Sequence, residues 1–207
     1  MIGIIDYGMG NLRSVQMGFA RVGAEARVIT TPQEVANASK LVLPGVGAFG
    51  DAISHLRSRG LDTAIVRAIQ TGRPFLGICL GLQLLFDVGY EDGQHTGLGV
   101  LPGKVVRFNF DDLPAGRRPS IPHMGWNQIE YADHVPLLAG VPSGSYMYFV
   151  HSYHVVPLTD RIVRVTTEFG GRPFVSAVAR DNLLATQFHP EKSQSIGLRI
   201  LENFAKS

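Results

Sequence analysis

The sequence predicts an α/β fold: a single domain with a mainly parallel central sheet flanked by helices, plus short mixed or antiparallel strands in its C-terminal half. In the first half of the chain, short β-branched runs alternate strictly with segments whose apolar residues recur at helical spacing. Such alternation is typical of parallel βαβ units around a buried sheet. From Gly97 onward, short apolar strands separated by Pro and Gly turns replace that pattern.

Four strands and several helices are predicted in the first half. Buried strands are expected at residues 1–7, 25–30, 40–43 and 73–79. Apolar residues at helical spacing predict helices within residues 12–22, 49–56 and 61–69, with a break at Gly60 between the last two. Residues 80–86 are apolar all round, so we expect a central, fully buried helix there.

The second half is expected to complete the same domain. Short strands are predicted at residues 104–108, 146–151, 162–167, 174–178 and 184–188. Ile196, Ile200, Leu201 and Phe204 recur at helical spacing and indicate a final amphipathic helix. The sequence has no internal repeat, low-complexity linker or charge block, so we interpret residues 1–207 as one domain with a long exposed loop at 111–122.

Composition narrows the class of protein. With 207 residues, of which 45% are hydrophobic, the chain can bury one core without a disulfide or a structural metal. Cys79 is the only cysteine and the N-terminus carries no basic-then-apolar leader, which together predict a reducing, cytoplasmic location. No apolar run approaches the ~20 residues needed to cross a bilayer.

The charge of the chain bears on its partners. Basic residues outnumber acidic ones by only 19 to 17 and are scattered, which argues against a nucleic-acid ligand. Charged residues make up 17% of the chain, below the ~25% that is typical of globular domains. Less of the surface is therefore expected to face water, as in a protein with a permanent partner.

The segment Gly77-Ile78-Cys79-Leu80-Gly81 is the first candidate for chemistry. It stands where an apolar strand meets an apolar helix, the layout of a nucleophile elbow, in which flanking glycines permit a tight turn. The N-terminus of the following helix favours a thiolate, and the Leu80 N–H can stabilise a developing oxyanion. A buried, inert cysteine is the alternative interpretation, and the glycines favour the elbow.

A thiol nucleophile needs a base, and the base needs a group that orients it. His189 and Glu191 follow the predicted strand 184–188, and strand alternation would place both on one side, with the histidine facing Cys79. A capped strand end would give the same His-Pro-Glu sequence, so this motif alone is a weak signal.

Two further patterns could indicate bound groups. The spacing of His151 and His154 could suit a metal, but no carboxylate or thiol cluster accompanies them, and we predict no metal site. Residues 45–50 satisfy G-x-G-x-x-G, yet they follow the third strand, and the acidic candidate Asp62 falls within a helix, unlike a dinucleotide site. We interpret these glycines as backbone that approaches a substrate carbonyl and supplies a second oxyanion donor.

With Cys79, residues 44–47 and the pair His189 and Glu191 in place, the chain resembles the class I (triad) glutamine amidotransferases over nearly its whole length. Four further motifs narrow the resemblance to one member of that family, and they occupy residues 6–11, 123–127, 148–153 and 187–193. The resemblance implies hydrolysis of glutamine through a cysteine thioester, without a cofactor.

The resemblance also implies a role for each matching residue. Cys79 matches the nucleophile, His189 the general base and later acid, and Glu191 the residue that orients the histidine. The residues that match the oxyanion site are Val46, Gly47 and Leu80. The residues that match the glutamine pocket are Gln83, Glu91, Ser152 and Tyr153. The residues that match the surface facing a partner are Asn11, Trp126, Tyr148 and Lys192.

The implied partner is a cyclase subunit with a (β/α)8 barrel, which forms a heterodimer with the chain and receives the ammonia. Gly89 stands where relatives often carry serine, so the side chain for one expected hydrogen bond to the substrate is absent.

The residues alone leave simpler interpretations open. Gln83 and Glu91 could be solvated surface residues, Trp126 and Tyr148 could be core aromatics, and Lys192 could be a plain surface lysine. A cysteine hydrolase acting alone, such as a small peptidase or thioesterase, is one competing function. A non-catalytic, flavodoxin-like binding module with a buried cysteine is another.

Overall fold

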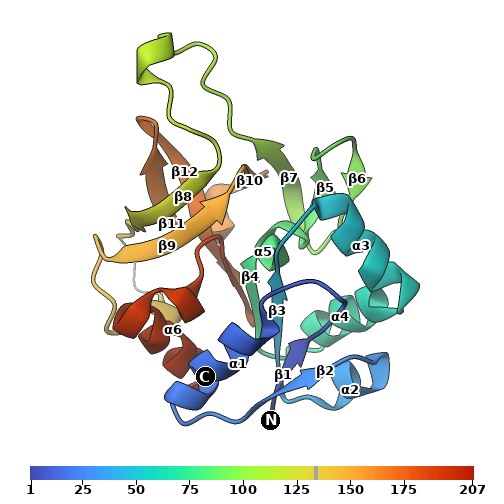
Figure 1. Ribbon diagram of the computed structural model, residues 1–207. Helices are drawn as coiled ribbons and strands as arrows, with labels where there is room; N and C mark the ends of the chain where they lie inside the picture. Colours follow the sequence, from blue (N-terminus) through green and yellow to red (C-terminus); the bar gives the residue numbers. More distant parts are fainter. Residues whose placement is uncertain (133–134) are drawn as a thin grey trace.

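Five parallel strands form one half of the main sheet in the computed structural model, which describes residues 1–132 and 135–207 (Figure 1). In spatial order they are β2 (Ala26–Ile29), β1 (Ile2–Ile5), β3 (Lys40–Gly45), β4 (Phe75–Cys79) and β13 (Leu183–Thr186). Every residue of β1 and β4 is buried, as expected for parallel strands covered on both faces. The four strands predicted in the first half are thus confirmed, and the late strand β13 joins them.

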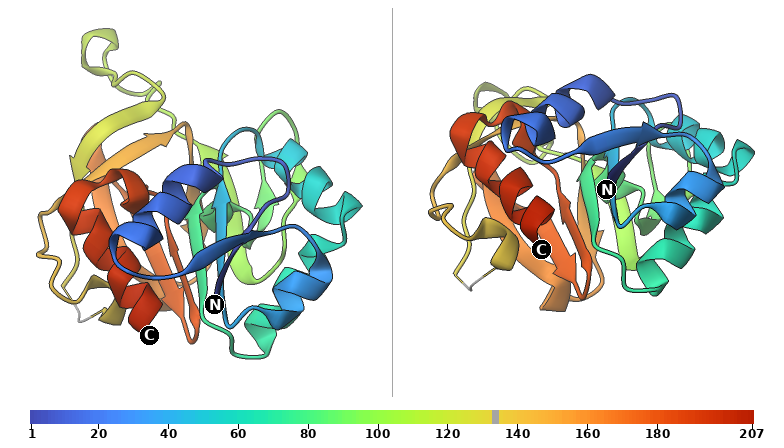
Figure 2. Two further views of the ribbon diagram at one scale, coloured as in Figure 1. Left: turned by 60° about the horizontal axis from the view of Figure 1, so that its bottom comes forward. Right: turned by 90° about the horizontal axis from the view of Figure 1, so that it is seen from below.

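Helices cover both faces of these strands (Figure 2). One face carries α1 (Leu12–Arg21) and α6 (Gln194–Lys206), and the other carries α2 (Pro32–Asn37), α3 (Phe49–Ser58) and α4 (Leu61–Gln70). Neighbouring strand residues point to opposite faces, so Ile4 packs on the α1–α6 side and Ile5 on the other. The predicted break is confirmed, since Gly60 separates α3 from α4 with a φ of 66°. None of the helices in the described residues combines the length and the apolar character needed to span a membrane.

Mostly antiparallel strands extend the sheet beyond β13, as predicted for the second half of the chain. In spatial order they are β12 (Arg172–Arg180), β10 (Tyr153–Pro157), β7 (Leu101–Arg107), β5 (Phe86–Gly89) and β6 (His95–Thr96), with β11 (Val163–Phe169) paired to β12. A separate antiparallel ribbon is formed by β8 (His123–Gln128) and β9 (Tyr146–His151). The predicted exposed loop, residues 111–122, projects from the body just before β8 (Figure 1).

The helix predicted at residues 80–86 is wrong beyond its first turn. The helix α5 spans only Leu80–Gln83, and β5 begins at Phe86. Backbone N–H groups of residues 98–101 donate to the carbonyls of residues 84–86, so these carbonyls are bonded to a neighbouring segment of the chain. The run is apolar all round because it is buried in the core, and a turn followed by a strand satisfies that burial as well as a helix does.

Gly81 allows β4 to turn directly into α5. A Cβ on Gly81 would lie 1.8 Å from the carbonyl oxygen of Leu43, a backbone atom that cannot move away without displacing β3. We expect Gly81→Ala to lower the free energy of unfolding by about 3 kcal/mol in urea denaturation. Gly116→Ala is the matched control, because its Cβ would have no atom of the described residues within 4 Å apart from its own chain neighbours, and we expect a change within about 0.5 kcal/mol. Equal stability of the two variants would contradict this close approach.

Candidate active site

Cys79 lies at a sharp turn between β4 and α5. Its φ of 56° is in the left-handed region, which residues other than glycine adopt rarely and at a cost. Glycines make room for the turn: a Cβ on Gly77 would lie 3.0 Å from the carbonyl oxygen of Gly81, and one on Gly45 would lie 2.8 Å from Cβ of Leu80. Strand, turn and helix form the elbow geometry that the sequence predicted, with Cys79 only 5% exposed.

His189 and Glu191 reach the same edge of the sheet from the far end of the chain. Because β4 and β13 are parallel neighbours, with Ile78 opposite Thr186, the residues that follow the two strands meet. Nδ1 of His189 lies 2.8 Å from Oε1 of Glu191, and both side chains are almost fully buried. The prediction that strand alternation places these two residues on one side is wrong. β13 ends at Thr186, and a turn of 3-10 helix at Pro190–Lys192 brings the carboxylate to the imidazole.

The neighbours of His189 determine its protonation. Burial by itself lowers the pKa of His189. The charge of Cys79 and the carboxylate of Glu191 have the opposite and larger effect, and the pKa rises to about 10. Because an ionised carboxylate only accepts, Nδ1 of His189 carries a proton. Nε2 of His189 has no hydrogen-bond partner in the described part of the chain. The arrangement favours a protonated, positively charged His189 next to Cys79.

A pocket of about 390 Å³ opens at the thiol. It is bounded by the loop that follows β3, by the elbow, and by the segment that joins β9 to β10. Its lining residues are Val46, Gly47, Cys79, Leu80, Gln83, Glu91, Pro122, Val150, His151, Ser152 and Tyr153. The residues matched to the oxyanion site and those matched to the glutamine pocket therefore line one cavity.

Two backbone segments meet beside the sulfur. Gly45 is the register partner of Cys79, so Val46 and Gly47 leave the end of β3 next to Leu80 at the start of α5. Gly47 has a φ of 100°, which glycine adopts without strain. Backbone N–H groups in such a position can stabilise negative charge on a substrate oxygen.

Gln83 and Glu91 are both held in place by hydrogen bonds. Gln83 is 4% exposed, so its interpretation as a solvated surface residue is wrong. Its Nε2 donates to the carbonyl of Tyr153 at 3.0 Å and to Oε1 of Gln187 at 3.1 Å, which leaves its own Oε1 to accept from a ligand. Oε2 of Glu91 accepts from the N–H of Phe49 at 2.8 Å. An acceptor and a negative charge suit a ligand that carries N–H donors and a positive charge.

Gly89 is not among the lining residues of this pocket. It is buried at the end of β5, where a Cβ would lie 2.7 Å from the ring of Phe49. A serine at this position would have to displace that ring. The Phe49 ring thus packs against Gly89, at the place where a serine side chain would lie.

The pairing of two buried histidines at the wall of the pocket was missed by sequence reasoning. Nδ1 of His123 lies 3.1 Å from Nε2 of His151, and Nδ1 of His151 lies 2.8 Å from the carbonyl of Tyr153. Burial lowers the pKa of His123 to about 4 and that of His151 to about 3, so both rings are neutral at pH 7. The two residues are opposite each other in the β8–β9 register, which no local pattern indicates. Within residues 1–132 and 135–207, no group of three or more His, Cys, Asp or Glu residues is placed to hold a metal ion.

Aromatic side chains gather on the outward face of the β8–β9 ribbon. Trp126 and Tyr148 are register partners whose ring centroids lie 5.9 Å apart, and Nζ of Lys192 lies 5.7 Å from the Tyr148 centroid. Trp126 is 47% exposed, so its interpretation as a core aromatic is wrong. Met124 and Tyr146 share this face and are 68% and 57% exposed. We call these five residues the aromatic face.

Asn11, the remaining residue matched to a partner-facing surface, is exposed and caps α1. Its Oδ1 accepts from the N–H of Ser14 at 3.3 Å. Farther along, helix α1 packs against the Pro190–Lys192 turn, where a Cβ on Gly18 would lie 3.4 Å from Cβ of Glu191.

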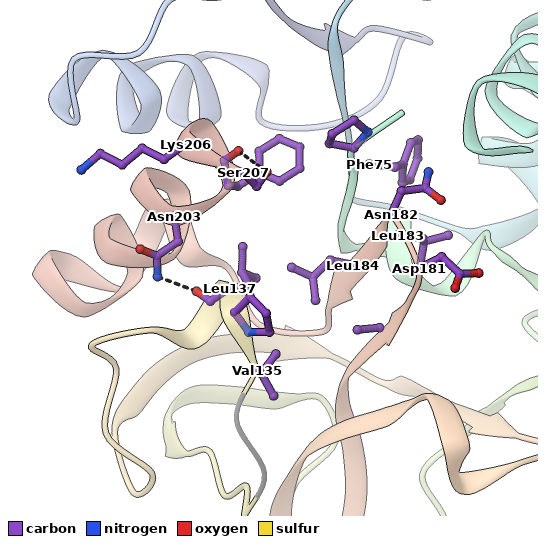
Figure 3. Close-up of a pocket in the computed structure, with 14 residues that line it drawn as sticks. Phe75, Val135, Leu137, Asp181, Asn182, Leu183, Leu184, Asn203, Lys206 and Ser207 are labelled. Atoms are coloured by element: carbon purple, nitrogen blue, oxygen red, sulfur yellow. Dashed lines mark hydrogen bonds between the residues drawn. The ribbon is translucent and has the colours of Figure 1, made fainter. Parts of the chain in front are cut away.

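Figure 3 shows a different pocket, of about 400 Å³, at the opposite end of β4 and β13. Phe75 and Leu183, the first residues of these two strands, line it together with Phe204 of α6. Its walls are mainly apolar, and the described residues that line it include no cysteine or histidine. This pocket is therefore separate from the chemistry at Cys79.

The chain matches known proteins along its length. It matches the family described as "Glutamine amidotransferase class-I" over residues 3–207. Relatives named "Imidazole glycerol phosphate synthase subunit HisH" include that of Syntrophotalea carbinolica, which is 57% identical over 99% of this chain and 98% of the relative. The relative from Geobacter sulfurreducens is 50% identical over 99% of this chain and 98% of the relative's own length.

Solved structures share the fold. A structure described as a glutamine amidotransferase has a TM-score of 0.75 at 20% identity and covers 100% of this chain and 99% of its own. PurLQS from Thermotoga maritima has a TM-score of 0.74 at 15% identity, with coverage of 99% and 97%. At these identities the likeness shows the fold alone. From the family match and the full-length relatives, the chain belongs to the class I glutamine amidotransferases, and within them to the family of the HisH subunits of imidazole glycerol phosphate synthase.

Proposed function

We propose that this chain is the glutaminase subunit of imidazole glycerol phosphate synthase and acts in histidine biosynthesis. It hydrolyses glutamine to glutamate and ammonia through a thioester on Cys79 and delivers the ammonia to a partner subunit. One observation carries the proposal: the thiol lies at a strained elbow, beside the buried pair His189 and Glu191, in a pocket that Gln83 and Glu91 line. Full-length relatives at 50% and 57% identity carry the corresponding name.

The proposed chemistry is an acyl transfer in two steps. The thiolate of Cys79 attacks the side-chain amide carbon of glutamine, and the N–H of Leu80 with one from Val46 or Gly47 stabilises the oxyanion. His189 gives the former thiol proton to the leaving nitrogen, so ammonia departs as the thioester forms. His189 then takes a proton from water, the water oxygen attacks the thioester, and glutamate leaves while the proton returns to the sulfur. Loss of one oxyanion donor typically costs ~10² to 10³ in rate.

Features of the pocket favour free glutamine over the substrates of a lone hydrolase. The Glu91 carboxylate suits the α-ammonium group of glutamine, and the acceptor oxygen of Gln83 suits an N–H donor of the same molecule. A small peptidase or thioesterase has no use for a carboxylate at this place. A non-catalytic module has no use for a cysteine held at a φ of 56°.

The proposed partner is a (β/α)8-barrel cyclase subunit, with which the chain forms a cytoplasmic heterodimer that joins a hydrolase to a lyase. Ammonia released into water is protonated and stops being a nucleophile, so the product has to pass through an interface. The aromatic face supports such an interface, because exposed apolar patches mark contact surfaces. It lies next to the pocket, since Val150 is opposite Met124 on the ribbon and also lines the pocket. Residues 1–207 act as one glutamine amidotransferase domain in this proposal.

Replacement of the nucleophile separates the two half-reactions. We expect Cys79→Ala to abolish glutamine-dependent synthase activity in the mixed complex, because no thioester forms. Activity fed with ammonium salts should survive, since the partner then receives ammonia from solution. Product formation with each nitrogen source is the measurement. Loss of both activities would point to a structural role for Cys79 and contradict the proposal.

Glu91→Gln tests recognition of the substrate. The amide keeps an oxygen that can accept from the Phe49 N–H but loses the negative charge. We expect KM for glutamine to rise about tenfold or more with little change in kcat, since a hydrogen bond between charged groups is lost in ground state and transition state alike. Glu25→Gln, at an exposed carboxylate paired with Arg27, is the matched control and should leave both constants unchanged. Normal KM in Glu91→Gln would remove this residue from the pocket's function.

The aromatic face is tested through the partner. We expect glutamine hydrolysis to be slow in the isolated chain. Its rate should rise about tenfold or more when the cyclase partner is added with its own ligand bound, with residues 44–50 as the segment that moves.

Trp126→Ala should weaken binding of the partner. We expect the partner concentration that gives half of the maximal acceleration to rise about thirtyfold. Leu158→Ala, at a residue that directly follows β10 and is 79% exposed, is the control and should behave as wild type. Equal turnover with and without the partner would refute the coupling.

A further inference from the structure

A directed chain of hydrogen bonds runs from the β8–β9 ribbon to the pocket. Nδ2 of Asn127 lies 3.0 Å from Nε2 of His123, and the His123–His151 pair leads on to the carbonyl of Tyr153. Because a carbonyl only accepts, Nδ1 of His151 carries the proton of its neutral ring and Nε2 accepts. The same reasoning places the proton of His123 on Nδ1 and leaves its Nε2 to accept from the Asn127 amide. Each of these hydrogen bonds is donated toward the pocket, while Nδ2 of Asn127 also donates to the carbonyl of Glu168.

The same carbonyl orients the side-chain amides on its other side, because it also accepts from Gln83. Gln83 donates one amide proton to the Tyr153 carbonyl and the other to Oε1 of Gln187. A flipped Gln83 would turn its oxygen toward that carbonyl, and a flipped Gln187 would turn its NH₂ group toward that of Gln83. The amide of Gln187 therefore has one orientation, with Nε2 directed at Sγ of Cys79 from 3.7 Å.

We propose that Gln187 is a positioning residue for the nucleophile: its Nε2–H donates to Sγ of Cys79, holds the sulfur in place and stabilises the thiolate. This inference rests on the proposed glutaminase function. Gln187 is fully buried and is not among the residues that line the pocket, so it acts on the substrate through the sulfur. The carbonyl of Val150, 3.9 Å from Sγ, can accept from the thiol but repels a thiolate, and the Gln187 amide offsets that repulsion.

Two other ionisable groups face the same sulfur. His189 supplies the positive charge, and burial together with the charge of Cys79 raises the pKa of Tyr7, so that its phenol stays neutral. Hydrogen bonds to charged groups are roughly twice as strong as those between neutral groups. The contribution of Gln187 therefore increases when the thiol loses its proton.

Gln187→Met removes the donor with little change in volume. Because Cys79 is the only cysteine, alkylation of the whole protein by iodoacetamide reports on this thiol alone. We expect the midpoint of the pH profile of alkylation to move upward and alkylation below that midpoint to slow about tenfold. In glutamine hydrolysis, kcat should fall about tenfold while KM stays within about twofold, because Gln187 does not touch the pocket.

Thr186→Val is the matched control. Thr186 is equally buried in the adjacent position, and its hydroxyl donates to the carbonyl of Phe188, not to the sulfur. We expect this variant to lose stability and to keep the alkylation profile and kcat of the wild type. An unchanged profile in Gln187→Met, or the same shift in both variants, overturns the proposal.

A second variant covers the case in which Gln187→Met does not fold. Gln83→Met removes the donor that orients Gln187, and we expect alkylation at acidic pH to slow about threefold. No change in this variant overturns the proposal. Alkylation needs no glutamine, so it tests the role of Gln187 independently of the proposed glutaminase function. An inactive wild-type chain with a shifted profile in the variants contradicts the glutaminase function, whereas an unshifted profile in an active enzyme contradicts the role of Gln187.

Discussion

The close approach of Gly81 to the carbonyl of Leu43 is the contact on which the rest of the site depends. It lets β4 pass into α5 without an intervening loop, so Cys79 is held in the left-handed region at a φ of 56°. A strained residue persists only where its surroundings over-determine it, and here β3 and β13 flank β4 on both sides. The sulfur consequently has a fixed place at the edge of the sheet where β13 ends, and His189 meets it there.

Buried imidazoles in this small region differ in protonation because their neighbours differ. Burial alone disfavours the charged form of each ring. His189 faces the carboxylate of Glu191 and the charge of Cys79, and these raise its pKa. His151 faces a carbonyl and a second neutral imidazole, so burial dominates and its pKa falls. Proton transfer is thus confined to one ring, while the His123–His151 pair stays neutral and can hold the pocket wall by directed hydrogen bonds.

Particular elements show how far the sequence predicts this fold. The alternating pattern of the first half correctly placed β1 to β4 and the break at Gly60, because local periodicity and burial agree there. α2 was missed although its capping box, Thr31 with Glu34, is visible in the sequence. β8 was missed because Gly125, at a φ of 125°, interrupts the strand pattern. The contact between His189 and Glu191 was anticipated, but through strand alternation and not through the 3-10 turn that makes it.

The sequence by itself determined the local chemistry: a cysteine between glycines at a strand–helix junction, a His-Pro-Glu motif after a late strand, and a glycine-rich turn after the third strand. Only the tertiary structure decided that His123 pairs with His151 and that Gln187 points at the sulfur. These contacts join residues 28 and 108 positions apart through strand register. Register depends on the packing of the whole sheet, and hydrogen bonds between distant side chains leave no periodic trace in the sequence.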